Sequence, residues 1–418
     1  MPTSLQRPGA KSLFVGACML ATAVYIGLVS LQYLATYFSQ KPDLASLQRA
    51  ARLQPGNAEY RYRVGRYLSL VQPSPQAALE SYRAAVTLNP NKALYWLDLA
   101  AVYQNMGNSG EQKAALEKAI NADPRTPDVA WESANVYLVQ GETAKALREF
   151  HVVLENDLSL APAALQLCLR VSPDVENLLQ QVMPPNPLVY FTLLDILTAR
   201  KQTADAAKVW AQLAQLRQPL ETRRVFEYLR YLIGQQEVDQ ARRVWQDASN
   251  LCGLSAYQPS SENLVINGDF SLEVLNGGFD WRYQKLPNVA LSLDPTQFHT
   301  GHRSLSIVFD GRGLEDAGIR QLIPVDPNAT YEFSAYFKSE GIQGAGGPRF
   351  VIQDSYNNVV YLASDELKDA DFWKQAGGAF TTGPTTKMLM LWVQRVPPGS
   401  PIRGKLWIDG VRLIQKRP

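Results

Sequence analysis

The stretch WLDLAAVYQNMG, residues 96–107, contains small, aromatic and glycine positions that return 34 residues further along the chain. The pairs that share this spacing are Pro90 with Pro124, Ala100 with Ala134, Tyr103 with Tyr137, and Gly107 with Gly141. A small residue lets two helices approach, an aromatic ring fills the space between them, and a glycine turns the chain. A proline ends a helix because it has no backbone N–H to donate. The spacing therefore predicts pairs of helices that repeat along the chain.

These residues resemble the tetratricopeptide repeat family, whose helix-turn-helix units stack into a solenoid. We place this helical region at residues 42–255, with its best units at 58–158 and a degenerate set at 188–252. The pattern departs from the family at Gln112, where a small residue is expected, and the period is lost between residues 162 and 187. We expect five or six helical hairpins.

The resemblance implies a concave surface, lined by the first helix of each hairpin, that binds a protein partner. The candidate contact residues on these helices are Arg61, Arg63, Tyr95, Asp98 and Asn105. A solvated polar face is the alternative interpretation of each of them.

The chain begins with a membrane-length apolar segment. No charged residue lies between Lys11 and Lys41, and about 20 apolar residues are enough to cross a bilayer. We therefore predict a transmembrane helix at residues 13–38 after a short cytoplasmic segment at residues 1–12. A cleaved signal peptide is the alternative, but its apolar core is usually about 7–15 residues long. The basic residues on the two sides nearly balance, so charge alone does not set the orientation.

Composition and the lack of known motifs argue against several classes of function. The chain has 418 residues, is 46% hydrophobic and has a net charge of +2, which predicts two or three globular domains and no nucleic-acid partner. The three cysteines, Cys18, Cys168 and Cys252, have no metal-site spacing and allow at most one bridge, between Cys168 and Cys252. Phosphate-binding loops, nucleophile elbows and metalloprotease motifs are absent from the sequence. We therefore expect a protein that is not an enzyme.

The last third of the chain has a different pattern. Residues 256–262 form a linker rich in serine and proline, and the segments after it alternate between apolar and polar residues. This alternation predicts an antiparallel β-sandwich at residues 263–418. The motifs NLVINGDF (263–270), GFDW (278–281), HTGHRSL (299–305) and GKLWIDGV (404–411) follow one another in order. The series resembles the jelly-roll carbohydrate-binding modules that are appended to xylanases and glucanases.

The predicted fold class is therefore a multidomain α plus β chain: one transmembrane helix, an α-solenoid and a C-terminal jelly roll. The second resemblance implies a sugar-binding face, which needs flat rings and a few planar polar groups. The ring candidates are Trp281, Tyr283, Tyr356 and Trp392, and the polar candidates are Arg282, Gln353, Gln394 and Arg395. Trp281 also fits a core position, whereas Tyr356 lies on an expected loop.

The same resemblance implies a structural calcium ion, because such modules often hold one near the first strand and the closing aspartate. The residues that could supply its oxygen ligands are Asp269, Glu273 and Asp409. We predict no other cofactor.

A sugar-binding module works outside the cytoplasm, so we expect the bulk of the chain beyond the inner membrane of a bacterial cell. The leading hypothesis is a membrane-anchored scaffold whose repeats bind a protein and whose sandwich contacts a glycan, in assembly or export of a surface polysaccharide. One alternative is a purely structural interaction subunit without a sugar site. Another is an accessory subunit of an enzyme that synthesises or ligates polysaccharide. Exposure of Tyr356, Trp392 and Arg395 on one concave face would favour glycan binding.

Overall fold

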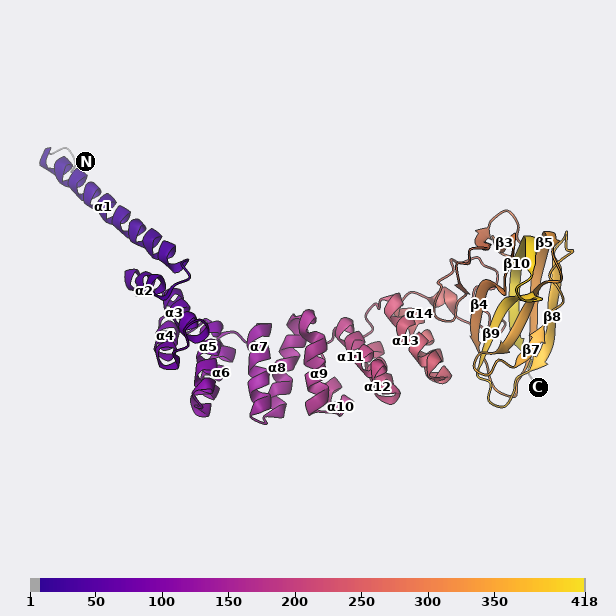
Figure 1. The fold of residues 1–418 in the computed structure, drawn as a ribbon, viewed down its shortest axis with the longest axis horizontal. Helices are drawn as coiled ribbons and strands as arrows, with labels where there is room; N and C mark the ends of the chain where they lie inside the picture. Colours follow the sequence, from indigo (N-terminus) through magenta and orange to yellow (C-terminus); the bar gives the residue numbers. More distant parts are fainter. Residues whose placement is uncertain (1–7, 417–418) are drawn as a thin grey trace, which may run out of the picture. The chain divides into compact units, whose positions relative to one another are not determined.

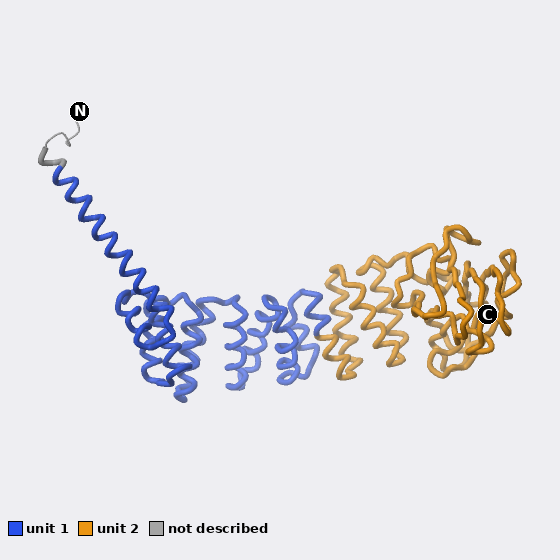
Figure 2. The backbone as a smooth tube through the Cα atoms, turned by 45° about the horizontal axis from the view of Figure 1, so that its top comes forward, with its two compact units in different colours: residues 1–192 blue, residues 193–418 orange. Residues whose placement is uncertain are grey.

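The computed structural model describes residues 8–416, which run from an N-terminal helix through a series of helices to a β-sandwich (Figure 1). They belong to two compact units, Met1–Thr192 and Leu193–Pro418 (Figure 2). Residues 1–7 of the predicted cytoplasmic segment and the last two residues of the predicted sandwich lie outside the described part. The division falls inside a helix, at a place that the sequence did not indicate.

Helix α1 (Pro8–Ser39) contains the predicted transmembrane segment. Its part from Ser12 to Ser39 is long and apolar enough to cross a membrane, although a signal sequence near an N-terminus has the same properties. The last turns of α1 pack into the first unit, where Ala35 is buried and the hydroxyl groups of Thr36 and Tyr60 lie 3.3 Å apart. The apolar helix therefore continues directly into the helical domain.

The first unit consists of helices that pack as hairpins. The helices after α1 are α2 (Leu44–Leu53), α3 (Ala58–Leu70), α4 (Pro75–Leu88), α5 (Ala93–Asn105), α6 (Ser109–Ala122), α7 (Pro127–Val139), α8 (Thr143–Asn156), η2 (Leu158–Leu160), α9 (Ala161–Val171) and α10 (Val175–Gln181). Helix α11 (Pro187–Ala199) crosses into the second unit. The strongest pairings join α3 to α4, α5 to α6, and α7 to α8, as the 34-residue period predicts.

Residues of the repeat pattern explain these hairpins. Gly107 and Gly141 have φ angles of 74° and 75°, a left-handed conformation that lets the chain turn after α5 and α7. In the preceding hairpin, a Cβ atom at Gly65 would lie 2.9 Å from the ring of Tyr82, so the small residue is needed for the close approach of α3 and α4. The predicted helical repeats are confirmed.

The second unit begins with the remaining helices, α12 (Thr203–Gln215), α13 (Thr222–Gly234) and α14 (Val238–Leu251), followed by the short η3 (Ser255–Tyr257). Trp210 of α12 stacks on Tyr228 of α13 at 5.4 Å between ring centroids, and its Nε1 donates to Asp247 Oδ2 of α14 at 2.8 Å. The predicted linker contains the end of η3, and its Ser260 forms an isolated bridge with Asn263, the first residue of the predicted sandwich.

In the described part of the chain, ten strands form two antiparallel sheets. Their bounds are β1 (Arg282–Tyr283), β2 (Val289–Asp294), β3 (Ser304–Gly313), β4 (Asp316–Pro324), β5 (Thr330–Gln343), β6 (Gly347–Asp354), β7 (Val360–Ala363), β8 (Lys374–Thr381), β9 (Met388–Val396) and β10 (Pro401–Gln415). The strand orders are β1-β4-β9-β6-β7, called here the β4 sheet, and β2-β3-β10-β5-β8, called the β10 sheet. One apolar core lies between them and includes Phe333 and Phe350 in edge-to-face contact at 5.4 Å. The predicted fold class is confirmed.

Candidate ligand-binding face

The outer face of the β4 sheet carries four of the eight predicted sugar-contacting residues, Arg282, Gln353, Trp392 and Gln394. Leu389, Leu391 and Val393 of β9 point into the core, so the alternation of a strand places Met388, Met390, Trp392 and Gln394 on the opposite side. Cross-strand pairing sets Arg282 beside Arg320, Arg320 beside Trp392, and Trp392 beside Val351. We call Arg282, Arg320 and Trp392 the arginine–tryptophan row.

Part of this outer face is covered by the helical hairpin α13–α14. Met388 and Val351 lie on the outer face, yet their exposed fractions are 0% and 3%. The contacts between hairpin and sandwich include a hydrogen bond from Tyr356 Oη to the carbonyl of Ile233 at 3.0 Å and an ion pair between Lys387 and Asp239 at 2.7 Å. The open part of the face is therefore smaller than in an isolated sandwich.

Two glycines allow the hairpin to approach the sandwich so closely. Gly277 and Gly278 precede β1, and Gly278 has a φ angle of 59°. A Cβ atom on Gly277 would overlap the ring of Phe226 from α13, and one on Gly278 would overlap the indole of Trp245 from α14. Trp245 also packs edge to face on Phe279 at 5.7 Å. These residues form the docking loop, Gly277 to Phe279.

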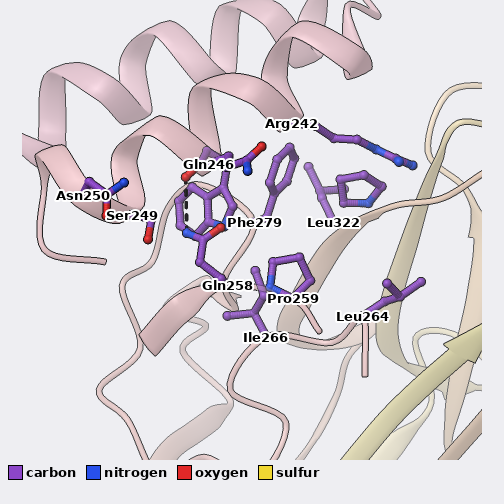
Figure 3. A pocket seen from close by; sticks show the side chains of 12 residues that line it. Arg242, Gln246, Ser249, Asn250, Gln258, Pro259, Leu264, Ile266, Phe279 and Leu322 are labelled. Atoms are coloured by element: carbon purple, nitrogen blue, oxygen red, sulfur yellow. Dashed lines mark hydrogen bonds between the residues drawn. The ribbon is translucent and has the colours of Figure 1, made fainter. Parts of the chain in front are cut away.

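A cavity of about 470 Å³ lies between α14, the linker and the start of the sandwich. Figure 3 shows Phe279, Leu322 and Pro259 between the helix that carries Gln246 and the strands of the sandwich. Leu322 and Arg320 point to the same side of β4 and are two residues apart, which is about 7 Å along a strand. The cavity therefore adjoins the arginine–tryptophan row.

Within residues 8–416, three arginines of this region have no acidic partner. Arg282 donates through Nη2 to the carbonyl of Gly278 at 2.8 Å, but its buried Nε has no hydrogen-bond partner among the described residues. Burial lowers the pKa of Arg282, and the positive charges of Arg230 from α13 and Arg320 lower it further. Arg230 and Arg320 are exposed. The face is therefore electropositive.

The predicted ring and polar candidates have different positions on the sandwich. Tyr283 is 48% exposed at β1, and Trp392 is half-buried with an Nε1 that has no hydrogen-bond partner in the described part of the chain. Gln353 is mostly buried and donates to Asn358 Oδ1 at 3.0 Å. Gln394 is partly buried beside Arg349 on the neighbouring strand. Tyr283 is thus exposed at the edge strand, and Trp392 is partly exposed although its Nε1 is buried.

Three other candidates are engaged inside the protein. Trp281 is 2% exposed, stacks on Phe270 at 5.2 Å and donates to the carbonyl of Asn267, so it belongs to the core. Arg395 is 1% exposed and donates to the backbone carbonyls of Val396, Ala345 and Pro401, so it holds loops together. Tyr356 is half-buried against α13 rather than free on a loop, and burial raises its pKa to about 12. Tyr356, Trp392 and Arg395 are therefore not exposed together on one face, which is the arrangement that would have favoured glycan binding.

The structure does not assemble the predicted calcium ligands. Glu273 pairs with Arg303 at 2.7 Å, and Asp269 accepts hydrogen bonds from Ser271. The carboxylate of Asp409 accepts from the backbone N–H groups of His299, Thr300 and Gly410. Between residues 8 and 416 no three His, Cys, Asp or Glu side chains are grouped to hold a metal ion.

Some of the predicted partner-binding residues of the repeats are engaged inside the protein, and others are not. Tyr95 is buried and donates to Glu59 Oε2 at 3.0 Å, while Arg63 pairs with Glu59 Oε1 at 2.8 Å. Asp98 accepts from Tyr82 at 3.3 Å, and burial raises its pKa. Tyr95 and Asp98 therefore join α5 to α3 and α4, whereas the pair of Arg63 and Glu59 lies within α3.

Asn105 is exposed and Arg61 is half-buried. A groove of about 420 Å³ lies between α5, α6 and α7, and Asp128 and Glu132 line it. This groove is a second surface that a partner could contact.

One sequence family matches the chain: residues 93–126 fit the tetratricopeptide repeat, which corresponds to α5 and α6. No curated protein sequence matches. Among solved structures, a crystal structure of MamA has 16% identity and a TM-score of 0.25, and the match covers 41% of this chain and 85% of MamA.

Two further structures are similar to parts of the chain. The CBM22-1 xylan-binding domain of Xyn10C from Paenibacillus barcinonensis has 15% identity and a TM-score of 0.26, over 36% of this chain and 93% of that domain. Yeast Tom70 has 18% identity and a TM-score of 0.29, over 53% of this chain and 49% of Tom70. The chain thus contains a tetratricopeptide repeat at residues 93–126, and its own strands form an antiparallel two-sheet sandwich.

Proposed function

We propose that this protein is a non-catalytic, membrane-anchored binding protein whose repeats hold a protein partner and whose sandwich contacts a glycan. The observation that carries the proposal is the arginine–tryptophan row on the outer face of the β4 sheet. There the half-buried indole of Trp392 lies beside the exposed Arg320, with Arg282 on the next strand, and its buried Nε1 has no hydrogen-bond partner among the described residues. Flat rings and planar polar donors are what sugar recognition requires.

The remaining parts fit this role. Helix α1 supplies an anchor of sufficient length, and an anchored glycan-binding protein works outside the cytoplasm. The repeats offer a groove between α5, α6 and α7 for a protein partner. Assembly or export of a surface polysaccharide in a bacterial cell would use both surfaces at once. In that setting the chain acts as a scaffold or as an accessory subunit of an enzyme.

A second candidate is a structural interaction subunit whose sandwich only caps the last helical hairpin. The burial of Met388 and Val351 under α13–α14 favours it, because this hairpin covers part of the face that a glycan would need. The two candidates differ in one measurable property, which is direct binding of polysaccharide.

The test uses the full chain in detergent micelles, titrated with a panel of bacterial and plant polysaccharides with and without calcium. We expect binding that is lost in Trp392→Ala and kept in Phe372→Ala, a control in which an 83% exposed ring outside the β4 sheet is removed. Circular dichroism checks that both variants are folded. A folded wild-type protein that binds no polysaccharide would replace glycan binding with the structural role.

A further inference from the structure

Three arginines from three separate elements meet at one end of the candidate face. Arg282 of β1 and Arg320 of β4 are direct cross-strand partners, so their Cβ atoms are about 5 Å apart on the same side of the sheet. Like charges in directly opposite positions destabilise a sheet. An unfavourable pair of this kind therefore needs compensation.

Helix α13 adds the third positive charge. Phe226, Arg230 and Ile233 are spaced i, i+4 and i+7, which places them on one side of the helix. The ring of Phe226 closely approaches Gly277, and the carbonyl of Ile233 accepts the hydrogen bond from Tyr356. Because both flanking residues touch the sandwich, Arg230 also faces it. Its charge is close enough to affect the pKa of Arg282.

The acidic groups around this contact have other partners. Asp326 pairs with Arg242 at 3.3 Å, and Asp239 pairs with Lys387 at 2.7 Å. Glu227 lies 4.0 Å from both Arg223 and Arg224. Within residues 8–416, no ion pair neutralises Arg230, Arg282 or Arg320.

Asp280 lies close in sequence to Arg282 but does not neutralise it. Its carboxylate is buried and accepts from the backbone N–H of Leu275 at 2.7 Å. Burial raises the pKa of Asp280 to about 7, so its charge is weakened at neutral pH. The acidic side chains named here are thus paired with other residues or weakened by burial, and none of them pairs with the three arginines.

We propose that the arginine–tryptophan row, together with Arg230, binds an acidic polysaccharide. An anionic group of the sugar lies among Arg230, Arg282 and Arg320, and its pyranose ring packs on Trp392. Guanidinium groups suit this role because they present paired donors to the two oxygens of a carboxylate. The inference rests on the proposed glycan function and adds the charge of the ligand.

The experiment compares polymers that differ in charge, using the full chain in detergent micelles. The probes are polygalacturonate and alginate as carboxylated polymers, dextran sulfate as a sulfated polymer, dextran and xylan as neutral polymers, and inorganic phosphate as a free anion. We expect the carboxylated polymers to bind and their affinity to fall as salt screens the charges. Arg320→Ala and Arg230→Ala should each weaken that binding about tenfold, which corresponds to 1.4 kcal/mol.

Arg403→Ala is the matched control, because Arg403 is an exposed arginine on β10 of the other sheet. Its removal should leave the affinity unchanged. Arg230 and Arg320 are exposed, so their loss is expected to leave the fold intact, which a thermal melt verifies.

The outcomes separate the two proposals. If neutral polymers bind as well as acidic ones, and Arg320→Ala has no effect, the acidic ligand is refuted while glycan binding stands. If inorganic phosphate binds the protein but no polymer does, the site is a small-anion site and both proposals are wrong. Binding of dextran sulfate that equals binding of the carboxylated polymers, with no difference between Arg320→Ala and Arg403→Ala, would show non-specific charge attraction and overturn the inference.

Discussion

Each outer face of the sandwich carries a tryptophan with basic side chains beside it, but the partners of these groups differ between the two faces. On the β10 sheet, the buried Trp407 donates through Nε1 to Asp294 Oδ2 at 2.8 Å, and the ammonium group of Lys405 lies 4.3 Å from the centre of its ring. Lys405 also pairs with Asp294 at 3.5 Å. On the β4 sheet, Trp392 has no partner for Nε1, and the neighbouring arginines have no acidic partners among the described residues.

This difference shows which of the two faces depends on groups outside its own sheet. On the face of the β10 sheet, Trp407 and Lys405 both find a partner in Asp294, and hydrogen bonds from Thr296 and Trp407 hold the pKa of Asp294 well below its usual range. The buried Oγ of Ser306 on this face has no partner among the described residues. The face of the β4 sheet relies on the hairpin α13–α14 for burial. Its Arg349 pairs with Glu366, but Arg282 and Arg320 have no acidic partner among the described residues. A face that is incomplete in this way is where a ligand contributes the most.

The largest effect is expected where the hairpin approaches the β4 sheet. Gly278→Ala would force a methyl group into the indole of Trp245 at a position with a φ angle of 59°. We expect a loss of about 3 kcal/mol or more in the free energy of unfolding. Urea unfolding of the full chain, followed by tryptophan fluorescence, measures it.

Gly341 in the β10 sheet provides the matched control. It has the same φ angle of 59°, but an added Cβ atom would meet nothing within 4 Å. Gly341→Ala should therefore show only the backbone strain, about 1 kcal/mol. Equal losses in the two variants would mean that the contact with Trp245 is unimportant for stability.

Asp280, directly after the docking loop, predicts a dependence on pH. Burial raises its pKa in the folded state from 3.8 to about 7, so the folded protein binds more protons than the unfolded chain between these values. Its contribution to stability is therefore present below about pH 4 and lost as the pH rises to 7 and above.

Asp280→Asn keeps an acceptor for Leu275 and removes the charge. We expect the variant to be more stable than the wild type at pH 8, by about 2 kcal/mol, and similar to it at pH 4. Thermal melts across this range measure the difference. A difference that does not change with pH would show that Asp280 titrates normally.

Replacing the tryptophan on each outer face by phenylalanine tests whether the two faces differ in the hydrogen bond of the indole N–H. Trp407→Phe removes the donor to Asp294 and leaves a buried acceptor with fewer partners, so we expect a loss of about 2 kcal/mol. Trp392→Phe removes a donor that has no described partner, so we expect a loss of less than about 1 kcal/mol. Urea unfolding compares the two variants. A larger loss at Trp392 would reverse our interpretation of the two faces.

Periodicity explains how much of the fold could be predicted. The 34-residue spacing gives the hairpins because each position has a local steric reason, and alternation gives the strands because one side of each faces the core. Trp281 shows the limit of such reasoning. A tryptophan after a turn fits a binding ring and a core ring equally well, and only the packing against Phe270 decides between them.

The docking of the hairpin could not be predicted, because it joins segments far apart in the sequence. Tyr356 lies in a turn rich in asparagine that suggests exposure, and its partner Ile233 is 123 residues away. The opposition of Arg282 and Arg320 likewise depends on the register of β1 and β4. One local signal was present in the adjacent glycines 277 and 278, since two residues without side chains indicate a close approach.

The smallest effect is expected for the ion pair between Lys387 and Asp239, which joins the sandwich to α14. Their side chains are 48% and 60% exposed, so solvent weakens the attraction, and a double-mutant cycle should give a coupling of about 0.5 kcal/mol. The pair of Lys405 and Asp294 is less exposed, and its coupling should be larger. If the Lys387 pair proved the stronger one, charge rather than the fit of glycines and aromatic rings would hold the hairpin to the β4 sheet.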